Sequence, residues 1–396
     1  MTDIRFVKNT MKKTFDSYTK LMGEEYAKVS LSYHQSFPEY EKTPLVHLYN
    51  LAKKLGLSSL CVKDESYRFG LNAFKVLGSS FAAGNIYAES KGIGSLSFSD
   101  LTSQKGREFF KSLTLYTATD GNHGRGVAWT AKTLGASAVV RMPKGTCEER
   151  LLNIRKLGAC ATIENKTYDE CVQMAYEECS KDNNGILVQD TALKGYEKIP
   201  IWIMQGYLTM AKEVSDDLKE APTHIFIQAG VGSLAGAVAG YFAQRFKEEL
   251  PKVIVVEPVG APCHFESAEN RKITRTEGEM STIMAGLACG EPNPVSWDIL
   301  RNNAFGFMVC SDDMSSLGMR ILSSPLRGDK RIICGESAGV GAGLVYTLME
   351  NPDFKHIKDA VELSEKSRVL LFSTEGDTNK EGYEDIVWKG RDPILP

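Results

Sequence analysis

The stretch that decides the fold is LTLYTATDGNHGRGVAWTAKTLGASAVVRMPKGTCEERLLNIRKLGACATI, residues 113–163. Short runs rich in β-branched and aromatic residues alternate here with longer amphipathic runs, which end in glycine as helices commonly do. Strands that alternate with helices in this way form parallel sheets with right-handed crossovers. The predicted strands are residues 113–119, 137–143, 159–164, 185–190, 223–230, 252–258 and 368–374, and the helices include 122–135, 148–158, 168–181 and 233–248.

These strand and helix units fall into two groups, at about 113–190 and 223–376. The sequence therefore predicts the α/β class, with two doubly wound open-sheet domains. We expect a small domain at residues 93–190, and a large domain formed by residues 1–92 together with 191–396.

Two segments lie outside this pattern. Residues 1–70 show no repeated unit and are expected to pack as an N-terminal extension. Residues 89–110, ESKGIGSLSFSDLTSQKGREFF, are polar and irregular, and we expect a surface excursion near the domain boundary.

The composition excludes several classes of protein. The chain has 396 residues, 42% of them hydrophobic, and a formal net charge of −3, so it has a large core and no basic footprint for nucleic acid. No apolar run reaches membrane-spanning length, and the first residues lack a signal peptide's apolar core, so a cytoplasmic location is expected. The nine cysteines form no CxxC pair, and no metal site is expected. Whether Cys263 and Cys289 pair stays open.

Lys75 is the only charged side chain in FGLNAFKVLGSSFAAGNIYA, residues 69–88. Burial would lower its pKa and leave the neutral amine that attacks carbonyl groups. Asn72 is a candidate N-cap, which would place Lys75 in the first turn of a helix, where the helix dipole lowers its pKa further. The alternative is a lysine that snorkels from a half-buried helix.

A glycine-rich loop, QAGVGSLAGAV at 228–238, follows a strand and opens a helix. Gly230, Gly232 and Gly236 permit tight turns whose free N–H groups can surround a phosphate. The spacing also resembles a dinucleotide-binding turn, with Glu257 at the end of the next strand as a ribose-binding acid. A glycine-rich turn that only packs a strand on a helix explains the loop equally well.

Two polar turns follow other predicted strands. In YTATDGNHGRG, residues 116–126, Thr119, Asp120 and Asn122 form a turn that can receive a carboxylate at a helix start; a well-capped helix is the alternative. In LLFSTEGDTN, residues 370–379, a hydroxyl at the strand's carboxyl end could bind a ring nitrogen; a solvated turn is the alternative.

Taken together and in this order, these motifs resemble the fold type II (tryptophan synthase β-like) pyridoxal phosphate enzymes. The segments MPKGTCEERLLNIRKLGA at 142–159 and CGESAGVGAG at 334–343 are similar to two further family segments. The resemblance covers about residues 40–390. Within the family, the acid at Asp120 and the segment VQDTA at 188–192 resemble the members that release ammonia from 2,3-diaminopropionate.

The resemblance implies a role for each matching residue. Lys75 would bind pyridoxal 5′-phosphate covalently, and Asn122 would bond its 3′-oxygen. Ser373 or Thr374 would bond the ring nitrogen. The cofactor phosphate would be held by the backbone N–H groups of Gly230, Val231, Gly232, Ser233 and Leu234, and the substrate carboxylate by the segment that contains Thr119, Gly121 and His123.

The expected reaction is α,β-elimination of 2,3-diaminopropionate, in both D and L forms, to pyruvate and ammonia. The substrate's second ammonium needs a counter-charge in a buried pocket, and Asp120 and Asp190 are the candidates. Lys75 would remove the Cα proton on one face and Asp120 on the other. A small amino acid is the expected partner, together with a second copy of the chain in a homodimer.

Two other functions fit parts of the sequence. A serine or threonine dehydratase, or a β-replacing synthase, would use the same motifs but has no need of the Asp120 charge. A nucleotide- or NAD-binding protein would use the loop at 229–236 but leaves Lys75 unexplained.

Overall fold

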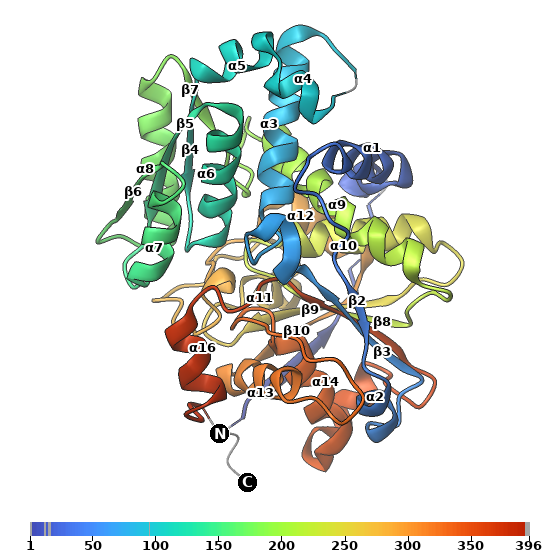
Figure 1. Ribbon diagram of the computed structural model, residues 1–396. Coiled ribbons are helices and arrows are strands. Elements are labelled where there is room, and N and C mark those ends of the chain that lie inside the picture. Colours follow the sequence, from blue (N-terminus) through green and yellow to red (C-terminus); the bar gives the residue numbers. More distant parts are fainter. Residues whose placement is uncertain (1, 12, 15–16, 95, 393–396) are drawn as a thin grey trace.

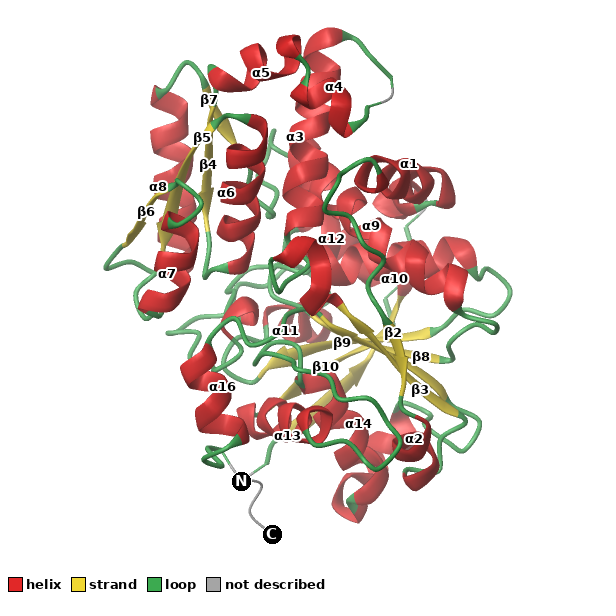
Figure 2. Ribbon diagram, in the orientation of Figure 1, coloured by secondary structure: helices red, strands yellow, loops and turns green. Residues whose placement is uncertain are grey.

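The computed structural model describes residues 2–11, 13–14, 17–94 and 96–392, which form two sheets with helices on both faces (Figures 1 and 2). The chain is α/β, as predicted. The smaller sheet is wholly parallel. Its strands lie in the order β6 (Cys160–Ile163), β5 (Ser137–Met142), β4 (Thr114–Ala118) and β7 (Gly185–Leu187).

The larger sheet has seven strands, with a parallel centre and one antiparallel strand at each edge. Their order is β1 (Ile4–Lys8), β10 (Ala304–Cys310), β9 (Lys252–Pro258), β8 (His224–Gln228), β11 (Arg368–Ser373), β3 (Ser59–Asp64) and β2 (Leu45–His47). Three of these strands come from residues 1–70. The expectation of an N-terminal extension outside the sheet pattern is therefore wrong.

Helices cover both faces of the larger sheet, and Figure 1 shows one group above the strands and another below. The upper group includes α1 (Glu24–Gln35), α9 (Lys198–Asp217), α10 (Ser233–Arg245) and α12 (Pro294–Asn303). The lower group includes α2 (Tyr49–Lys54), α13 (Asp312–Ser323) and α14 (Val340–Glu350). Shorter elements complete this part: η1 (Tyr18–Met22), η2 (Glu65–Gly70), α11 (Cys263–Asn270), η3 (Ala285–Leu287), η4 (Pro352–Phe354), α15 (Lys355–Ala360) and α16 (Lys380–Val387).

The central strands are apolar throughout because the sheet is buried on both sides. In β8, Ile225 and Ile227 pack into the core on one face, while Phe226 packs into the core on the other. A continuous apolar run is thus divided between two cores by the two-residue period of a strand.

The smaller sheet lies between α6 (Asn122–Leu134) on one side and α8 (Tyr168–Lys181) on the other, with α7 (Glu148–Arg155) beside β6 (Figure 1). The helix α3 (Val76–Lys91) packs against both α9 and α6, and so joins the helices of the two sheets. Residues 89–110 are not irregular as expected, because α4 (Phe98–Thr102) and α5 (Gln104–Lys111) form there. Ser97 and Ser103 cap these helices.

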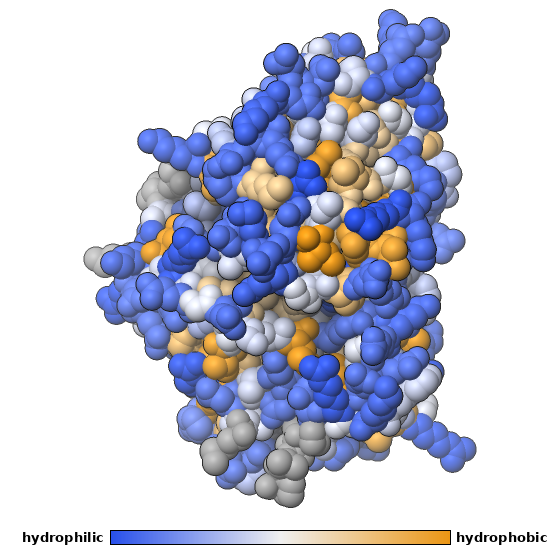
Figure 3. Space-filling view, turned by 90° about the vertical axis from the view of Figure 1, so that its left-hand side faces the viewer, coloured by the Kyte–Doolittle hydropathy of each residue, from blue (hydrophilic) through white to orange (hydrophobic). Residues whose placement is uncertain are grey.

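The surface in Figure 3 is mostly hydrophilic, and hydrophobic residues gather on it in separate small groups. None of the helices in the described part of the chain has the length and apolar character of a membrane span.

Two buried histidines predict how stability depends on pH. Burial, with Arg68 adding to it, lowers the pKa of His34 to about 3, and burial lowers the pKa of His224 to about 4, both from 6.5. As the pH falls, the unfolded chain binds a proton at each histidine before the folded chain does. The contribution of the two neutral imidazoles to stability is therefore present above pH 6.5 and is lost as the pH falls through their folded pKa values. We expect the free energy of unfolding to fall by about 1.4 kcal/mol per pH unit for each histidine in that window.

Urea denaturation at a series of pH values checks this expectation. His224→Gln should flatten the slope, whereas His356→Gln, on the exposed surface, should leave it unchanged. An unaltered slope in His224→Gln would show that this imidazole is protonated in the folded chain.

Candidate active site

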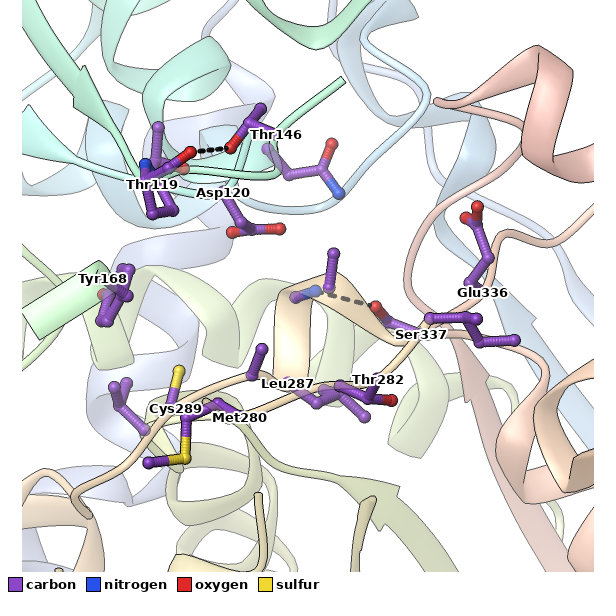
Figure 4. Close-up of a pocket in the computed structure, with 18 of the residues that line it drawn as sticks. Thr119, Asp120, Thr146, Tyr168, Met280, Thr282, Leu287, Cys289, Glu336 and Ser337 are labelled. Atoms are coloured by element: carbon purple, nitrogen blue, oxygen red, sulfur yellow. Dashed lines mark hydrogen bonds between the residues drawn. The ribbon is translucent and has the colours of Figure 1, made fainter. Parts of the chain in front are cut away.

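A cavity of about 1300 Å³ lies where the carboxyl ends of strands from both sheets meet. The turns after β4, β7, β8 and β11 all line it, as expected for a ligand site in open α/β sheets. Figure 4 shows Asp120 and Tyr168 across the cavity from Leu287 and Cys289. All the predicted site residues except Gly121 and Ser373 are on its wall: Lys75, Thr119, Asp120, Asn122, His123, Asp190, Gly230, Val231, Gly232, Ser233, Leu234 and Thr374.

Lys75 stands directly before α3, and its ammonium group meets Asp190. The Nζ–Oδ2 distance is 2.5 Å, and the two side chains are 20% and 4% exposed. Asn72 does not cap the helix as predicted: it has φ +56°, and its amide donates to Asp377. The loop is instead held by pairing of Ala73 with Glu375, which aligns Lys75 with the segment after β11.

The ion pair determines the charge on both partners. Burial lowers the pKa of Lys75, but the carboxylate of Asp190 outweighs burial, and the net shift is upward. The expectation of a lowered lysine pKa is therefore wrong. The segment 69–88 contains no acid, and the carboxylate that raises the lysine pKa comes from Asp190, far along the chain. Burial raises the pKa of Asp190. The Lys75 ammonium lowers it by more than burial raises it, and the resulting pKa is about 2.

Asp190 also connects the lysine to the glycine-rich loop. Its backbone carbonyl accepts hydrogen bonds from Ser233 Oγ at 2.5 Å and from Asn293 Nδ2 at 3.2 Å. His123 Nδ1 lies 3.9 Å from its carboxylate, and burial lowers the pKa of this imidazole. His123 Nε2 pairs with the carbonyl of Val188, which holds the ring beside Asp190. Its Nδ1 has no hydrogen-bond partner among the described residues.

The turn after β4 directs Asp120 and Asn122 to different partners. Thr119 Oγ1 accepts from the N–H of Gly121 at 2.8 Å, and α6 begins at Asn122 with no side-chain cap. The carboxylate of Asp120 lies 3.4 Å from Arg150 Nη1. The amide of Asn122 donates to the carboxylate of Glu375, in the segment after β11.

The glycine-rich loop leads into α10 at Ser233, and Gly232 adopts φ +91°. A Cβ atom on Gly232 would lie 2.3 Å from His264 Nε2, and one on Gly230 would lie 2.7 Å from the carbonyl oxygen of Gly286. Only glycine fits this close backbone at both positions. No side chain caps the start of α10 within the described chain, so the loop can receive an anion.

Glu257 does not face this loop as a ribose-binding acid would. It is fully buried, and its carboxylate accepts hydrogen bonds from the backbone N–H groups of His264 and Phe265 at 2.9 and 2.8 Å. With Cys263 and His264 it forms a cluster of potential metal ligands that the sequence pattern did not reveal. The carboxylate's hydrogen bonds to His264 account for the close approach of these groups.

The two hydroxyls at the end of β11 lie on opposite sides of the backbone. Thr374 is on the cavity wall, where its Oγ1 accepts from Gln228 Nε2 at 2.9 Å. Ser373 is fully buried, is not on the wall, and its Oγ has no hydrogen-bond partner among the described residues. Thr374 is therefore the hydroxyl that can reach a ligand in the cavity.

The cysteines are all free thiols, Cys263 and Cys289 included. Cys289 lies on the cavity wall, and burial raises the pKa of both thiols well above the ordinary value. They are thus poor nucleophiles at neutral pH.

Known proteins share this arrangement. Residues 37–372 match the family described as pyridoxal-phosphate dependent enzyme. The chain is 46% identical to diaminopropionate ammonia-lyase from Salmonella typhimurium, over 98% of each chain, and 43% identical to that of Escherichia coli K12, over 97% of each.

The chain belongs to the diaminopropionate ammonia-lyase family of pyridoxal-phosphate dependent enzymes.

Solved structures agree with this assignment. The Escherichia coli enzyme in complex with D-serine superposes with a TM-score of 0.93 at 40% identity, covering 100% of this chain and 99% of the other. Threonine deaminase from Solanum lycopersicum superposes with a TM-score of 0.74 at 21% identity over 99% and 98% of the chains, and shares the fold.

The cavity suits the cofactor of this family. Its wall offers a lysine amine, a glycine-rich anion-binding loop and a threonine hydroxyl, which match an aldehyde, a phosphate and a pyridine nitrogen. The three groups come from three separate segments, before α3, after β8 and after β11.

Several wall residues were missed from the sequence. The further residues are Arg150, Tyr168, Gln228, Cys289, Glu336, Ser337 and Glu375. Three of them lie in recognised family segments, Arg150 in 142–159 and both Glu336 and Ser337 in 334–343. Tyr168 lies between Thr167 and Glu170, whose side chains form a capping box. That pattern is a signal of a helix start but not of a site.

Replacement of Gly232 tests the anion-binding loop. Gly232→Ala adds a Cβ against His264 and Ser296 as well as strain at positive φ, so we expect cofactor affinity to fall by roughly tenfold or more. Absorbance titration of the cofactor-free protein with pyridoxal phosphate measures this.

Gly135→Ala is the matched control, because Gly135 has φ +90° with open space around it. This variant should lose stability and keep its cofactor affinity. Equal affinities for the two variants would contradict the proposed contact between loop and phosphate.

Proposed function

We propose that the chain catalyses α,β-elimination of 2,3-diaminopropionate, in both D and L forms, to pyruvate and ammonia. The observation that carries the proposal is the meeting of Lys75, Asp190 and Asp120 in one cavity of a chain from this family. A lysine with two separate acids suits a substrate that carries two amines.

The cofactor would be held by residues from four turns. Lys75 would bind it covalently, Asn122 would bond the 3′-oxygen, and Thr374 would bond the ring nitrogen. The backbone N–H groups of Gly230, Val231, Gly232, Ser233 and Leu234 would hold the phosphate. Pyridoxal phosphate supplies the electron sink that weakens the Cα–H bond of a bound amino acid.

Lys75 and Asp120 would move the Cα proton. The Lys75 amine would take it from one face of the substrate, and the Asp120 carboxylate from the other. Asp190, ionised and 2.5 Å from Lys75, would hold that amine in position while it gives up and regains its proton. Thr119, Gly121 and His123 would form the turn that receives the substrate carboxylate.

The acidic wall would stabilise the second ammonium of the substrate. Asp120 and Asp190 are the proposed counter-charges, because burial of an unpaired ammonium is costly. A hydroxyl leaving group, as in serine or threonine, carries no positive charge. The charges on this wall therefore favour diaminopropionate over the substrates of a dehydratase.

The remaining expectations concern assembly and location. We propose that the chain acts as a homodimer in the cytoplasm. We also propose a small domain at residues 93–190 and a large domain formed by 1–92 and 191–396; the two sheets support this division.

A pyruvate assay with D- and L-diaminopropionate and with serine tests the function. We expect release of pyruvate from both diaminopropionate isomers with a clear preference over serine. A preference for serine would instead favour the dehydratase function.

Asp120→Asn tests the assignment of bases. Loss of a general base typically lowers the rate by about 100-fold or more, so kcat on the D isomer should fall by that factor. Activity on the L isomer should fall far less, and Asp353→Asn on the exposed surface should change neither. Equal losses on both isomers would mean that Asp120 acts only as a counter-charge, a role common to both, and is not the base for the D isomer.

A further inference from the structure

Arg150 is placed between two carboxylates on the cavity wall. Its Nη1 lies 3.4 Å from Asp120 Oδ2 and also 3.4 Å from the Asp120 backbone carbonyl. Its Nη2 lies 4.0 Å from Glu336 Oε2. Asp120 and Glu336 come from separate segments of the chain and enter the cavity from different directions (Figure 4).

The arginine side chain is firmly enclosed. It is 7% exposed, and a Cβ atom on Gly121 would lie 2.9 Å from its Cδ, so its stem fills the space beside the turn. Burial lowers the pKa of Arg150, but Asp120, Glu375 and Glu336 outweigh burial and raise it. A permanent positive charge thus stands directly behind Asp120.

An arginine in an amino-acid site commonly binds the substrate carboxylate. Here both terminal nitrogens already face acids of the protein: Asp120 at Nη1 and Glu336 at Nη2. The contact to the Asp120 backbone carbonyl further ties the guanidinium to this turn. Arg150 is therefore placed to pair with the carboxylate of Asp120 and not with the carboxylate of the substrate.

We propose that Arg150 is a positioning residue for the D isomer, which holds the Asp120 carboxylate aimed at Cα. The inference rests on the proposed function. In the step that it serves, the Cα–H bond breaks and the proton moves to an Asp120 oxygen. The electron pair becomes the Cα–Cβ double bond as ammonia leaves Cβ. The L isomer, deprotonated by Lys75, has no such need of Arg150.

The test compares Arg150→Gln, Arg150→Lys and the wild-type holoenzyme on both isomers. Misplacement of a reacting group by about 1 Å can cost about 100-fold, so kcat of Arg150→Gln on the D isomer should fall by roughly 10- to 100-fold. On the L isomer kcat should stay within about threefold. Arg150→Lys keeps the charge and should recover part of the lost rate.

Two further measurements separate positioning from other roles. Calorimetric dissociation constants of D- and L-serine should change by less than about threefold, since the substrate carboxylate binds elsewhere. Arg155→Gln, on the same helix with its guanidinium donating to the carbonyl of Ala161, is the control and should behave as wild type. Cofactor absorbance and thermal unfolding should match wild type in Arg150→Lys.

Three outcomes would overturn the inference. Equal loss of kcat on both isomers would assign Arg150 a general structural role. A large rise in the dissociation constant of both serine isomers would make it the substrate's anchor. A wild-type enzyme inactive on the D isomer would overturn the two-base function and the inference with it, whereas the first two outcomes leave the proposed function intact.

Discussion

The site depends on one partly enclosed ion pair, between Lys75 at the start of α3 and Asp190 after β7. Neither charge is stable in this environment without the other, because an uncompensated charge removed from water is costly. The pair therefore determines where both segments lie. The backbone of Asp190 is in turn bound by Ser233 and Asn293, so the same contact aligns the glycine-rich loop with the lysine. Helix, strand end and loop come from distant parts of the chain and meet at Asp190, the lysine at its carboxylate and the loop at its backbone carbonyl.

Electrostatics explains the chemistry that this arrangement supports. The cavity wall carries more carboxylates than cations, and Asp120, Asp190, Glu336 and Glu375 are among its acids. Burial and the nearby Glu375 carboxylate raise the pKa of Glu336. A further cation in the cavity would stabilise the ionised form of these acids. A diamino acid brings that charge, and a hydroxy amino acid does not. In the proposed function, the acids would favour a diamino acid, while Lys75 and the glycine-rich loop are suited to hold the cofactor.

Much of the fold follows from local sequence, and the failures have physical causes. In the larger sheet, β8, β9 and β11 were found because they are continuous apolar runs, whereas the parallel strands β3 and β10 were missed. The edge strand β1 lies far in sequence from its partner β10, and the edge strand β2 is only three residues long. Strand β10 contains Gly306, which packs against the ring of Phe6. A pattern search that relies on apolar runs passes over such strands.

The site residues also fall into two groups, those that local sequence identifies and those that depend on contacts between distant segments. Motif order identified Lys75, the turn at Asp120 and the glycine-rich loop, which are local in sequence. The charge on Lys75 and the partner of Asp120 depend on Asp190 and Arg150, and no local pattern connects them. The choice between Ser373 and Thr374 depends on which side of β11 faces the cavity, which only the packed sheet determines.

Mass spectrometry of the borohydride-reduced holoenzyme tests the central claim most directly. Reduction makes a lysine–cofactor bond permanent, and the account predicts a pyridoxyl group on the peptide that contains Lys75. Lys144, which also lines the cavity among the described residues, is an internal control and should be unmodified. A pyridoxyl group on Lys144, on another lysine or on none would contradict the account.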